Sequence, residues 1–507
     1  MSGAGLLALS GLNTYSGGTT LNGGTLQLGN ASALGAAGLT LNAGVIDLAS
    51  FSPTVTSLSG SASTIITNSG AADATLTVNQ SGTTSFGGAL SDGPTNKMAL
   101  ALSGGGLTLS GSNTYSGTTT ITNGQLYLAS SSAIPISGNV VLGSVSDSNS
   151  PGILTTQNNQ FGAGTVMSFV NIRDSGGSGW THFQLEGTQQ ALAGISDSNG
   201  AGIVENSETG VGGTSQLTLS PAATASYSFD GLIRNATGTI GLAFTGPGAQ
   251  TLSGGNIQYT GSTSVSGGTL TLQNTGNFAS SSIAISGRGA LIFNPGTGGL
   301  NSVYSGSTSV SGGTLTLQDT RNFVSAITVG ASGTLNLVRS VAGISGKTAI
   351  TGPISGDGTI NVNNSGSGTS GGWVTFIGSA GLNNFTGTIH GSQVYGTDGA
   401  IDQGILALAK VGPGTLILSG SNSYIGGTDV QDGTLAAASS DAIPPGSGLT
   451  VESGGTVVFG DLSEAGATMV ARSSLAGVAA VPEPDTLALL AVGAMAAMFG
   501  VWRRKKS

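Results

Sequence analysis

The stretch GAGLLALSGLNTYSGGTTLNGGTLQL, residues 3–28, decides the fold. Its last four residues, Thr25 to Leu28, alternate polar and apolar side chains, which is the pattern of a strand with one buried face. The turn Asn22-Gly23-Gly24 comes directly before them, where glycine supplies a positive φ that other residues avoid. One strand pair of this size cannot bury its apolar face by itself, so we expect copies of the stretch to stack.

Further copies of this stretch occur along the chain. The clearest is GGGLTLSGSNTYSGTTTITNGQLYL at residues 104–128, and weaker copies run from Gly246 to Leu272 and from Gly412 to Leu435. Residues 259–278 and 304–323 are near duplicates. Stacking would give a solenoid with Leu, Val and Ile inside and Thr, Ser and Asn ladders outside. A β-sandwich or separate small sheets are the alternatives that similar strands allow.

Each copy resembles the autotransporter-associated β-strand repeat, whose core is Gly-x-Gly-x-Leu-x-Leu-Ser-Gly-x-Asn-x-Tyr-x-Gly-x-Thr. The match is strong at 3–28 and 104–128, fair at 412–435, and partial at 246–272 and 304–317. The resemblance implies a right-handed parallel β-helix on an exported passenger. We therefore predict an all-β fold, a right-handed parallel β-helix (β-solenoid) with a single C-terminal hydrophobic helix.

Tyrosine recurs at one position of the repeat, as Tyr15, Tyr115, Tyr259, Tyr304 and Tyr424. The favoured interpretation is an aromatic ring packing over a turn. A platform on which carbohydrate rings stack is the alternative.

The C-terminus has three parts in order. Val481-Pro482-Glu483-Pro484-Asp485 is held extended by its prolines. Residues 486–502 carry no charge and would form a helix of roughly 25 Å, at the short limit for crossing a bilayer core of about 30 Å. Its larger apolar side chains are Leu487, Leu489, Leu490, Val492, Met495, Met498, Phe499, Val501 and Trp502. The basic residues Arg503, Arg504, Lys505 and Lys506 follow and would hold the end in the cytoplasm.

This tail resembles a PEP-CTERM sorting signal. The resemblance implies processing near Pro482-Glu483-Pro484 by an exosortase, a membrane transpeptidase. It also implies transient residence in the inner membrane, followed by transfer to the cell surface or extracellular matrix. An ordinary single-span anchor or a buried helix is the alternative. Residues 1–5 show no signal-peptide pattern, so we expect the true start of the protein to lie upstream.

The composition excludes several classes of site. The chain has no cysteine and two histidines, His182 and His390, so disulfides, thiolate metal sites and histidine metal clusters are not expected. The formal net charge is −9 with only 7% charged residues, which argues against nucleic-acid binding. We expect no catalytic residue, metal or cofactor.

Some motifs look chemical. Residues 366–371 fit Gly-x-Gly-x-x-Gly and residues 368–372 fit Gly-x-Ser-x-Gly around Ser370, but a strand rather than a helix is expected after them. Carboxylates are scattered as Asp398 and Asp402, Asp429 and Asp432, and Glu205 and Glu208, with Lys410 the basic residue nearest to them. Most of these carboxylates neighbour Gly or Ser and suit turns.

Residues 143–227 depart most from the repeat. They hold the densest set of chemically capable side chains, Arg173, Asp174, Trp180, His182 and Glu186. A variable spacer is the favoured interpretation, and a ligand site, if present, is expected here. The predicted division is 1–142 repeats, 143–245 divergent region, 246–462 repeats, 463–480 flexible linker and 481–507 sorting signal.

The sequence thus predicts an exported, non-enzymatic surface or matrix protein with a role in adhesion or matrix structure. Its expected partners are an exosortase, the membrane before processing, and exopolysaccharide. A polysaccharide-active β-helix enzyme, either lyase or hydrolase, is one alternative. An autotransporter-like passenger lacking its barrel is another.

Overall fold

The computed structural model describes most of residues 3–460 and a short segment beyond. The described residues are 3–131, 136–145, 149–171, 179–197, 199–206, 213–253, 255, 257–273, 278–294, 304–318, 323–339, 349–350, 354–364, 373–377, 382–385, 388–391, 407–411, 413–424, 426–460 and 469–471. The chain divides into two compact units, residues 1–292 and 293–507, and each is described by itself.

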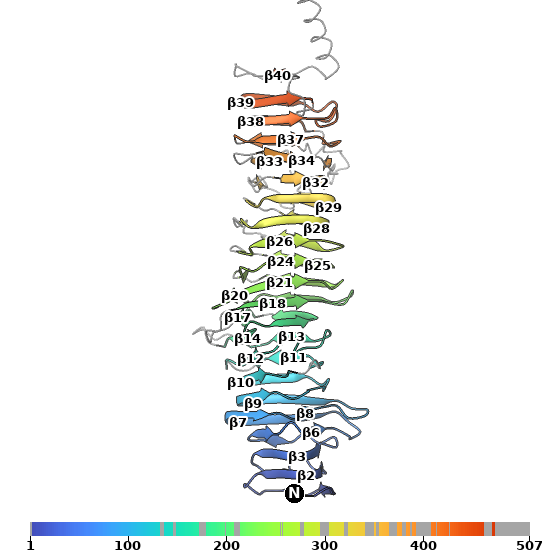
Figure 1. The fold of residues 1–507 in the computed structure, drawn as a ribbon, viewed down its shortest axis with the longest axis vertical. Helices are drawn as coiled ribbons and strands as arrows, with labels where there is room; N and C mark the ends of the chain where they lie inside the picture. The colour runs from blue at the N-terminus through green and yellow to red at the C-terminus, as the bar shows by residue number, and fades with distance from the viewer. Residues whose placement is uncertain are drawn as a thin grey trace, which may run out of the picture. The chain divides into compact units, whose positions relative to one another are not determined.

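The first unit consists of short strands joined by tight turns (Figure 1). Its strands are β1 (Leu6–Leu9), β2 (Thr19–Leu28), β3 (Leu39–Asp47), β4 (Thr54–Val55), β5 (Leu58–Gly60), β6 (Thr64–Thr67), β7 (Ala74–Phe86), β8 (Ala89–Leu90), β9 (Met98–Leu109), β10 (Thr119–Leu128), β11 (Val140–Leu142), β12 (Gly152–Thr155), β13 (Val166–Phe169), β14 (Thr181–Gln184), β15 (Gln189–Leu192), β16 (Gly194–Asp197), β17 (Gly202–Asn206), β18 (Thr214–Leu219), β19 (Ser226–Phe229), β20 (Leu232–Asn235), β21 (Thr239–Phe244), β22 (Ala249–Leu252), β23 (Ile257–Gln258), β24 (Thr263–Val265), β25 (Thr269–Gln273) and β26 (Ser282–Ile285).

Strand β27 (Ala290–Asn294) contains the boundary, and the second unit continues with strands of the same kind. They are β28 (Ser307–Gln318), β29 (Ile327–Arg339), β30 (Ala349–Ile350), β31 (Ile354–Gly356), β32 (Thr359–Asn364), β33 (Trp373–Ile377), β34 (Leu382–Phe385), β35 (Thr388–Gly391), β36 (Ala407–Val411), β37 (Thr415–Leu418), β38 (Thr428–Ala437), β39 (Leu449–Phe459) and β40 (Met469–Ala471).

In the first unit, each strand pairs in parallel with the equivalent strand one turn of the solenoid later; we call one such turn a coil. Leu7 lies opposite Leu26, Leu26 opposite Ile46, and Ile46 opposite Ile66, so apolar residues form an interior column through β1, β2, β3 and β6. A second column runs from β10 to β23 and holds Leu126, Ile153, Phe183, Val204, Ile233 and Ile257, all buried. Stacked strands thus bury the apolar face that one copy could not.

The second unit is built in the same way. Leu315 lies opposite Leu335, and Leu335 opposite Ile360, in parallel strands β28, β29 and β32. Its last pairing differs, because β40 runs antiparallel to β39 and places Val470 opposite Val458.

Glycine is required where the long strands turn a corner. Gly124 in β10 has φ +89°, and a Cβ there would lie 2.1 Å from the carbonyl oxygen of Gly105 in the coil before. Gly44 repeats this relationship, with φ +98° and a Cβ position 2.3 Å from the Gly24 oxygen. At these corners the backbones of successive coils approach too closely for any side chain.

The prediction of an all-β parallel β-solenoid is confirmed, and the β-sandwich alternative is wrong. The four leucines on which it rests, Leu26, Leu126, Leu270 and Leu315, are all buried. The predicted C-terminal helix lies outside the described residues. Among the residues that are described, the structure contains no helix with the length and apolar character to span a bilayer. The division into five segments remains a prediction.

Candidate functional site

The strands of the divergent region stack in register and present outward-facing columns of unusual composition. Glu205 of β17 lies between Gln184 of β14 and Arg234 of β20, each directly opposite it. Its neighbour in sequence, Val204, points to the interior, so the Glu205 side chain starts from the outer face of the sheet. Glu205 is nevertheless completely buried.

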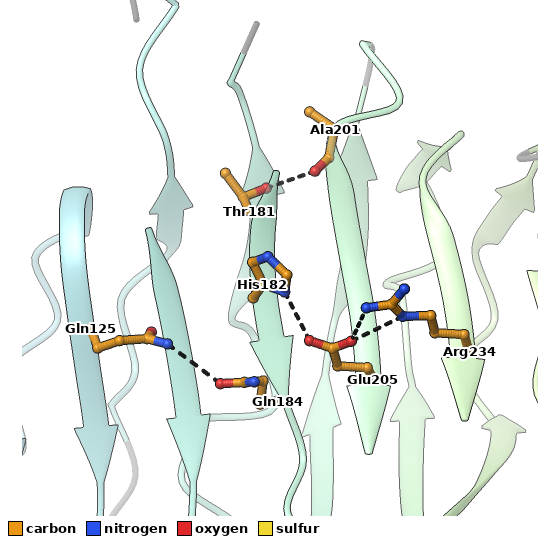
Figure 2. Close-up of polar contacts among 7 residues, drawn as sticks. All are labelled: Gln125, Thr181, His182, Gln184, Ala201, Glu205 and Arg234. Carbon is orange, nitrogen blue, oxygen red and sulfur yellow. Dashed lines mark hydrogen bonds and ion pairs between the residues drawn. The ribbon is translucent and has the colours of Figure 1, made fainter. Parts of the chain in front are cut away.

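Glu205 joins two basic side chains from neighbouring coils (Figure 2). Its Oε1 atom is 2.8 Å from Nδ1 of His182, and Arg234 donates to its Oε2 from Nη2 at 2.7 Å and from Nε at 3.0 Å. The side chains of Glu205, His182 and Arg234 are 0%, 20% and 38% exposed. The carboxylate is therefore enclosed while both partners reach water.

The electrostatics keep this carboxylate ionised. Burial raises the pKa of Glu205, but hydrogen bonds and positive charge from His182 and Arg234 outweigh burial and hold the pKa below its ordinary value of 4.5. A carboxyl group that is charged at neutral pH has no proton to donate and so cannot act as a general acid. Both of its oxygens are held by basic partners, so the arrangement links three coils.

A glutamine contact extends this group of residues by two coils. Gln125 of β10 donates from Nε2 to Oε1 of Gln184 at 3.5 Å, across the coil that contains β12 (Figure 2). Gly152 of β12 lies directly opposite Gln125, and a Cβ there would meet its Oε1 at 2.0 Å. The glycine thus makes room for the Gln125 side chain. The Gln125 Oε1 atom is buried and accepts no hydrogen bond from the residues that the structure describes.

Sequence reasoning found part of this group of residues. His182 was among the residues expected to matter, whereas Arg173 and Asp174 lie outside the described residues. The sequence offers Glu205 only as one of a scattered pair with Glu208. Glu205 lies inside strand β17 rather than in a turn, and Glu208 lies outside the described residues. Arg234 was missed, because it falls outside the stretch that departs most from the repeat.

A second carboxyl group of the divergent region is also buried. Asp197 ends β16 and accepts hydrogen bonds from the backbone N–H groups of Asn199 and Gly202. It lies in register with Phe169 and Phe229, whose rings are in edge-to-face contact 5.4 Å apart. Burial raises the pKa of Asp197, and the nearby Asp230 charge adds to this. We therefore assign this carboxyl a structural role, because it holds the backbone of the turn that follows β16.

The recurring tyrosines are part of the interior. Tyr115, Tyr259, Tyr304 and Tyr424 are buried, and Tyr15 in the first coil is 39% exposed. The hydroxyls of Tyr115, Tyr259 and Tyr424 each bond the threonine hydroxyl four residues later at 2.7 Å. Buried rings present no face to a sugar, so the packing interpretation holds for these four tyrosines and the stacking alternative is wrong for them.

The carboxylates and the lysine weighed for polysaccharide chemistry do not form a site in the described residues. Lys410 is fully buried and donates from Nζ to the backbone oxygen of Asp432 at 3.0 Å. Asp429 is buried and accepts from Gln431. Asp398, Asp402 and residues 365–372, including Ser370, lie outside the described residues, and His390 is placed only as part of the β35 backbone. No group of three potential metal ligands occurs in the part of the chain that is described.

Comparison with known families agrees with the fold. The family described as Passenger-associated-transport-repeat matches residues 1–28, 103–128, 245–272, 286–317 and 408–437. The family described as PEP-CTERM protein-sorting motif matches residues 480–505. The sorting residues Pro482, Glu483 and Pro484 and the segment 486–502 lie outside the described residues, so their structure remains a prediction.

One curated protein is also similar. The chain is 30% identical over 296 residues to the adhesin BmaC autotransporter of Brucella suis biovar 1 (strain 1330), which covers 54% of this chain. The chain spans only 6% of the length of that relative. No solved structure matches. The passenger repeats and the sorting motif together indicate export, and the chain therefore carries passenger-associated-transport repeats in a β-solenoid body and a PEP-CTERM protein-sorting motif at its C-terminus.

Proposed function

We propose that this chain is a non-enzymatic adhesin-like β-solenoid that acts at the cell surface or in the extracellular matrix. The observation that carries the proposal is the similarity to an adhesin autotransporter over 296 residues, a length that must include several coils. The enclosed state of Glu205, Asp197 and Lys410 supports a body whose ionisable groups serve its structure.

The outer faces of the coils supply a physical basis for adhesion. Neutral polar side chains bond from coil to coil, as Asn42 to Asn22 at 2.6 Å, Ser196 to Ser168 at 2.9 Å and Thr239 to Thr214 at 3.1 Å. Such ladders repeat hydroxyl and amide groups along each unit. Many weak contacts of this kind to the hydroxyls of an exopolysaccharide would add up through multivalency.

Sorting by the tail completes the proposal. The matched motif at residues 480–505 supports recognition by an exosortase near Pro482-Glu483-Pro484. In this view residues 486–502 hold the chain in the inner membrane and Arg503 to Lys506 stay in the cytoplasm. Processing would then release the solenoid to the surface or matrix.

Binding and catalysis can be tested in one experiment. The purified full chain is incubated with exopolysaccharide from the producing cells, and pelleted complex and reducing ends are both measured. We expect co-sedimentation that grows with polymer length and no new reducing ends or unsaturated sugars. New reducing ends or unsaturated sugars would replace the adhesin proposal with the lyase or hydrolase alternative. If the chain bound neither the polysaccharide nor the cells that produce it, the adhesin proposal would be wrong.

Sorting is tested separately. Glu483→Ala removes the acidic residue between the two prolines, and Glu464→Ala is the matched control, the same substitution in the predicted linker. We expect tagged Glu483→Ala to stay in the inner-membrane fraction while the wild type and Glu464→Ala reach the surface. Equal distribution of all three would count against the sorting role.

A further inference from the structure

Three asparagines of the chain are followed directly by glycine, in the pairs Asn22-Gly23, Asn123-Gly124 and Asn199-Gly200. All three asparagines are exposed. In such a pair the backbone nitrogen of the glycine can reach the side-chain amide carbon of the asparagine, because glycine has no side chain in the way and leaves its backbone free to rotate. The fold decides which of the three pairs is held in a reactive arrangement.

Asn123 lies at the corner of the long strand β10. The register between β10 and β9 shifts on both sides of Asn123, so the backbone ladder is interrupted there. The Gly124 N–H donates to Oδ1 of the adjoining Asn123 at 2.9 Å. This bond holds the backbone nitrogen against the side-chain carbonyl group, which is the arrangement that precedes attack on the carbonyl carbon.

We propose that Asn123 is a site of spontaneous deamidation. The Gly124 nitrogen gives up its proton and forms a bond to Cγ of Asn123, while the bond from Cγ to Nδ2 breaks and Nδ2 leaves with a proton as ammonia. One water molecule then opens the cyclic imide and gives aspartate or isoaspartate. The reaction consumes one water, releases one ammonia and needs no other reactant. It places a negative charge on β10, whose 10 residues carry none.

The second unit contains the product residue at the equivalent corner. Asp432-Gly433 of β38 occupies the position of Asn123-Gly124 in its copy of the repeat, and the register of β38 with β39 also shifts there. The Gly433 N–H donates to Oδ1 of Asp432 at 2.8 Å, and Asp432 is exposed. A carboxylate at position 123 would therefore accept the same hydrogen bond without a change in the backbone.

The other two pairs are held away from the reactive arrangement. The Gly200 N–H donates to Oδ1 of Asp230 at 3.0 Å, so its nitrogen is engaged by another side chain. The Asn22 Oδ1 atom accepts from Nδ2 of Asn42 at 2.6 Å, which directs its side-chain carbonyl towards the next coil. At each of these pairs a hydrogen bond to a third residue must break before the ring closes, whereas at Asn123 the hydrogen bond joins the two reacting groups.

The proposal predicts that one pair of the folded chain reacts selectively. The purified full chain is stored in a mild detergent at mildly alkaline pH, and peptide mapping by mass spectrometry follows aspartate plus isoaspartate at each pair. Asn123→Asp supplies the reference for the aspartate product. We expect Asn123 to convert at least about tenfold faster than Asn22 and Asn199, because their hydrogen bonds to other residues must first break.

A denatured sample shows whether the fold causes this selectivity. In denaturant the three pairs should convert at similar rates, since glycine follows each asparagine. Equal rates in the folded chain, no conversion at Asn123, or a preference for Asn123 that persists in denaturant would each overturn the proposal.

Matched variants provide a second measurement. Asn123→Gln has a longer side chain, whose ring closure is less favourable, and Asn199→Gln is the same substitution at another exposed Asn-Gly pair. On ion-exchange chromatography, the wild type and Asn199→Gln should develop a more acidic form during storage, whereas Asn123→Gln should not. An acidic form that persists in Asn123→Gln, or that disappears in Asn199→Gln, would contradict the assignment.

Discussion

Arg234 donates two hydrogen bonds to Oε2 of Glu205, one coil away, and the carboxylate they hold is completely buried on the outer face of a sheet. A buried charge is tolerated only when it is paired and hydrogen-bonded. His182 supplies the remaining partner on Oε1. Three coils of the divergent region are thus joined by side chains as well as by their backbone ladders.

Removing the charge of Glu205 should loosen these coils. Glu205→Gln keeps the shape of the side chain but removes the carboxylate charge that Arg234 bonds, and we expect a loss of about 1–3 kcal/mol in local stability, below the usual cost because Arg234 reaches water. Arg234→Met should cost more, since it leaves the wholly buried carboxylate of Glu205 without its two hydrogen bonds from Arg234. Because long repeat arrays do not unfold in one step, hydrogen exchange of β14, β17 and β20 is the measurement. Glu452→Gln, at an exposed glutamate, is the control and should change exchange little.

The contribution of Glu205 should depend on pH with a defined sign. Its pKa is lower in the folded chain than the ordinary value of 4.5, so the folded state binds the proton less readily than the unfolded state. The stabilisation is then fully present above about pH 4.5 and lost as pH falls through the folded pKa. The difference in protection between wild type and Glu205→Gln should therefore be present at pH 5 and shrink as pH falls below about 4.5. Asp197, whose pKa is raised, is present in both proteins, so its effect cancels in the comparison. A difference that grows as pH falls below about 4.5 would contradict this assignment.

The repeats were predictable from sequence because each copy supplies the register of the next. Leu26 and Leu270 follow the same alternation, and both are buried. The contact between Glu205 and Arg234 was not predictable, because it joins residues 29 positions apart in coils that have no matching copy. In these coils the lengths of the loops decide which residues of successive strands lie opposite each other, and those lengths follow no sequence period. The pairing of Tyr115 with Thr119 could have been found, since a threonine follows the tyrosine at the same spacing in every copy.

This tyrosine–threonine pair gives a comparison between two copies of one motif. Tyr115 and Tyr15 each bond a threonine hydroxyl at 2.7 Å, but only Tyr115 is buried. Tyr115→Phe leaves the Thr119 hydroxyl in the interior without this partner, which should cost about 1–2 kcal/mol. Tyr15→Phe should cost less than about 0.5 kcal/mol, because water can replace the lost bond. Thermal unfolding and hydrogen exchange of β10 and β2 test the difference, and equal effects would show that burial does not decide it.

The corner glycine Gly124 allows a further matched test, because Gly82 also lies within a long strand but in open surroundings. Gly124→Ala would place a Cβ 2.1 Å from the Gly105 oxygen and force a left-handed φ of +89° on alanine. The conformation costs about 1 kcal/mol, and the contact is with backbone, which cannot move without shifting its coil. We expect a total loss above about 2 kcal/mol and faster exchange in β9 and β10. Gly82→Ala in β7 meets nothing within 4 Å and should be neutral or slightly stabilising, because alanine restricts the unfolded chain. If both variants behaved alike, close approach of successive backbones would not be the reason for glycine at these corners.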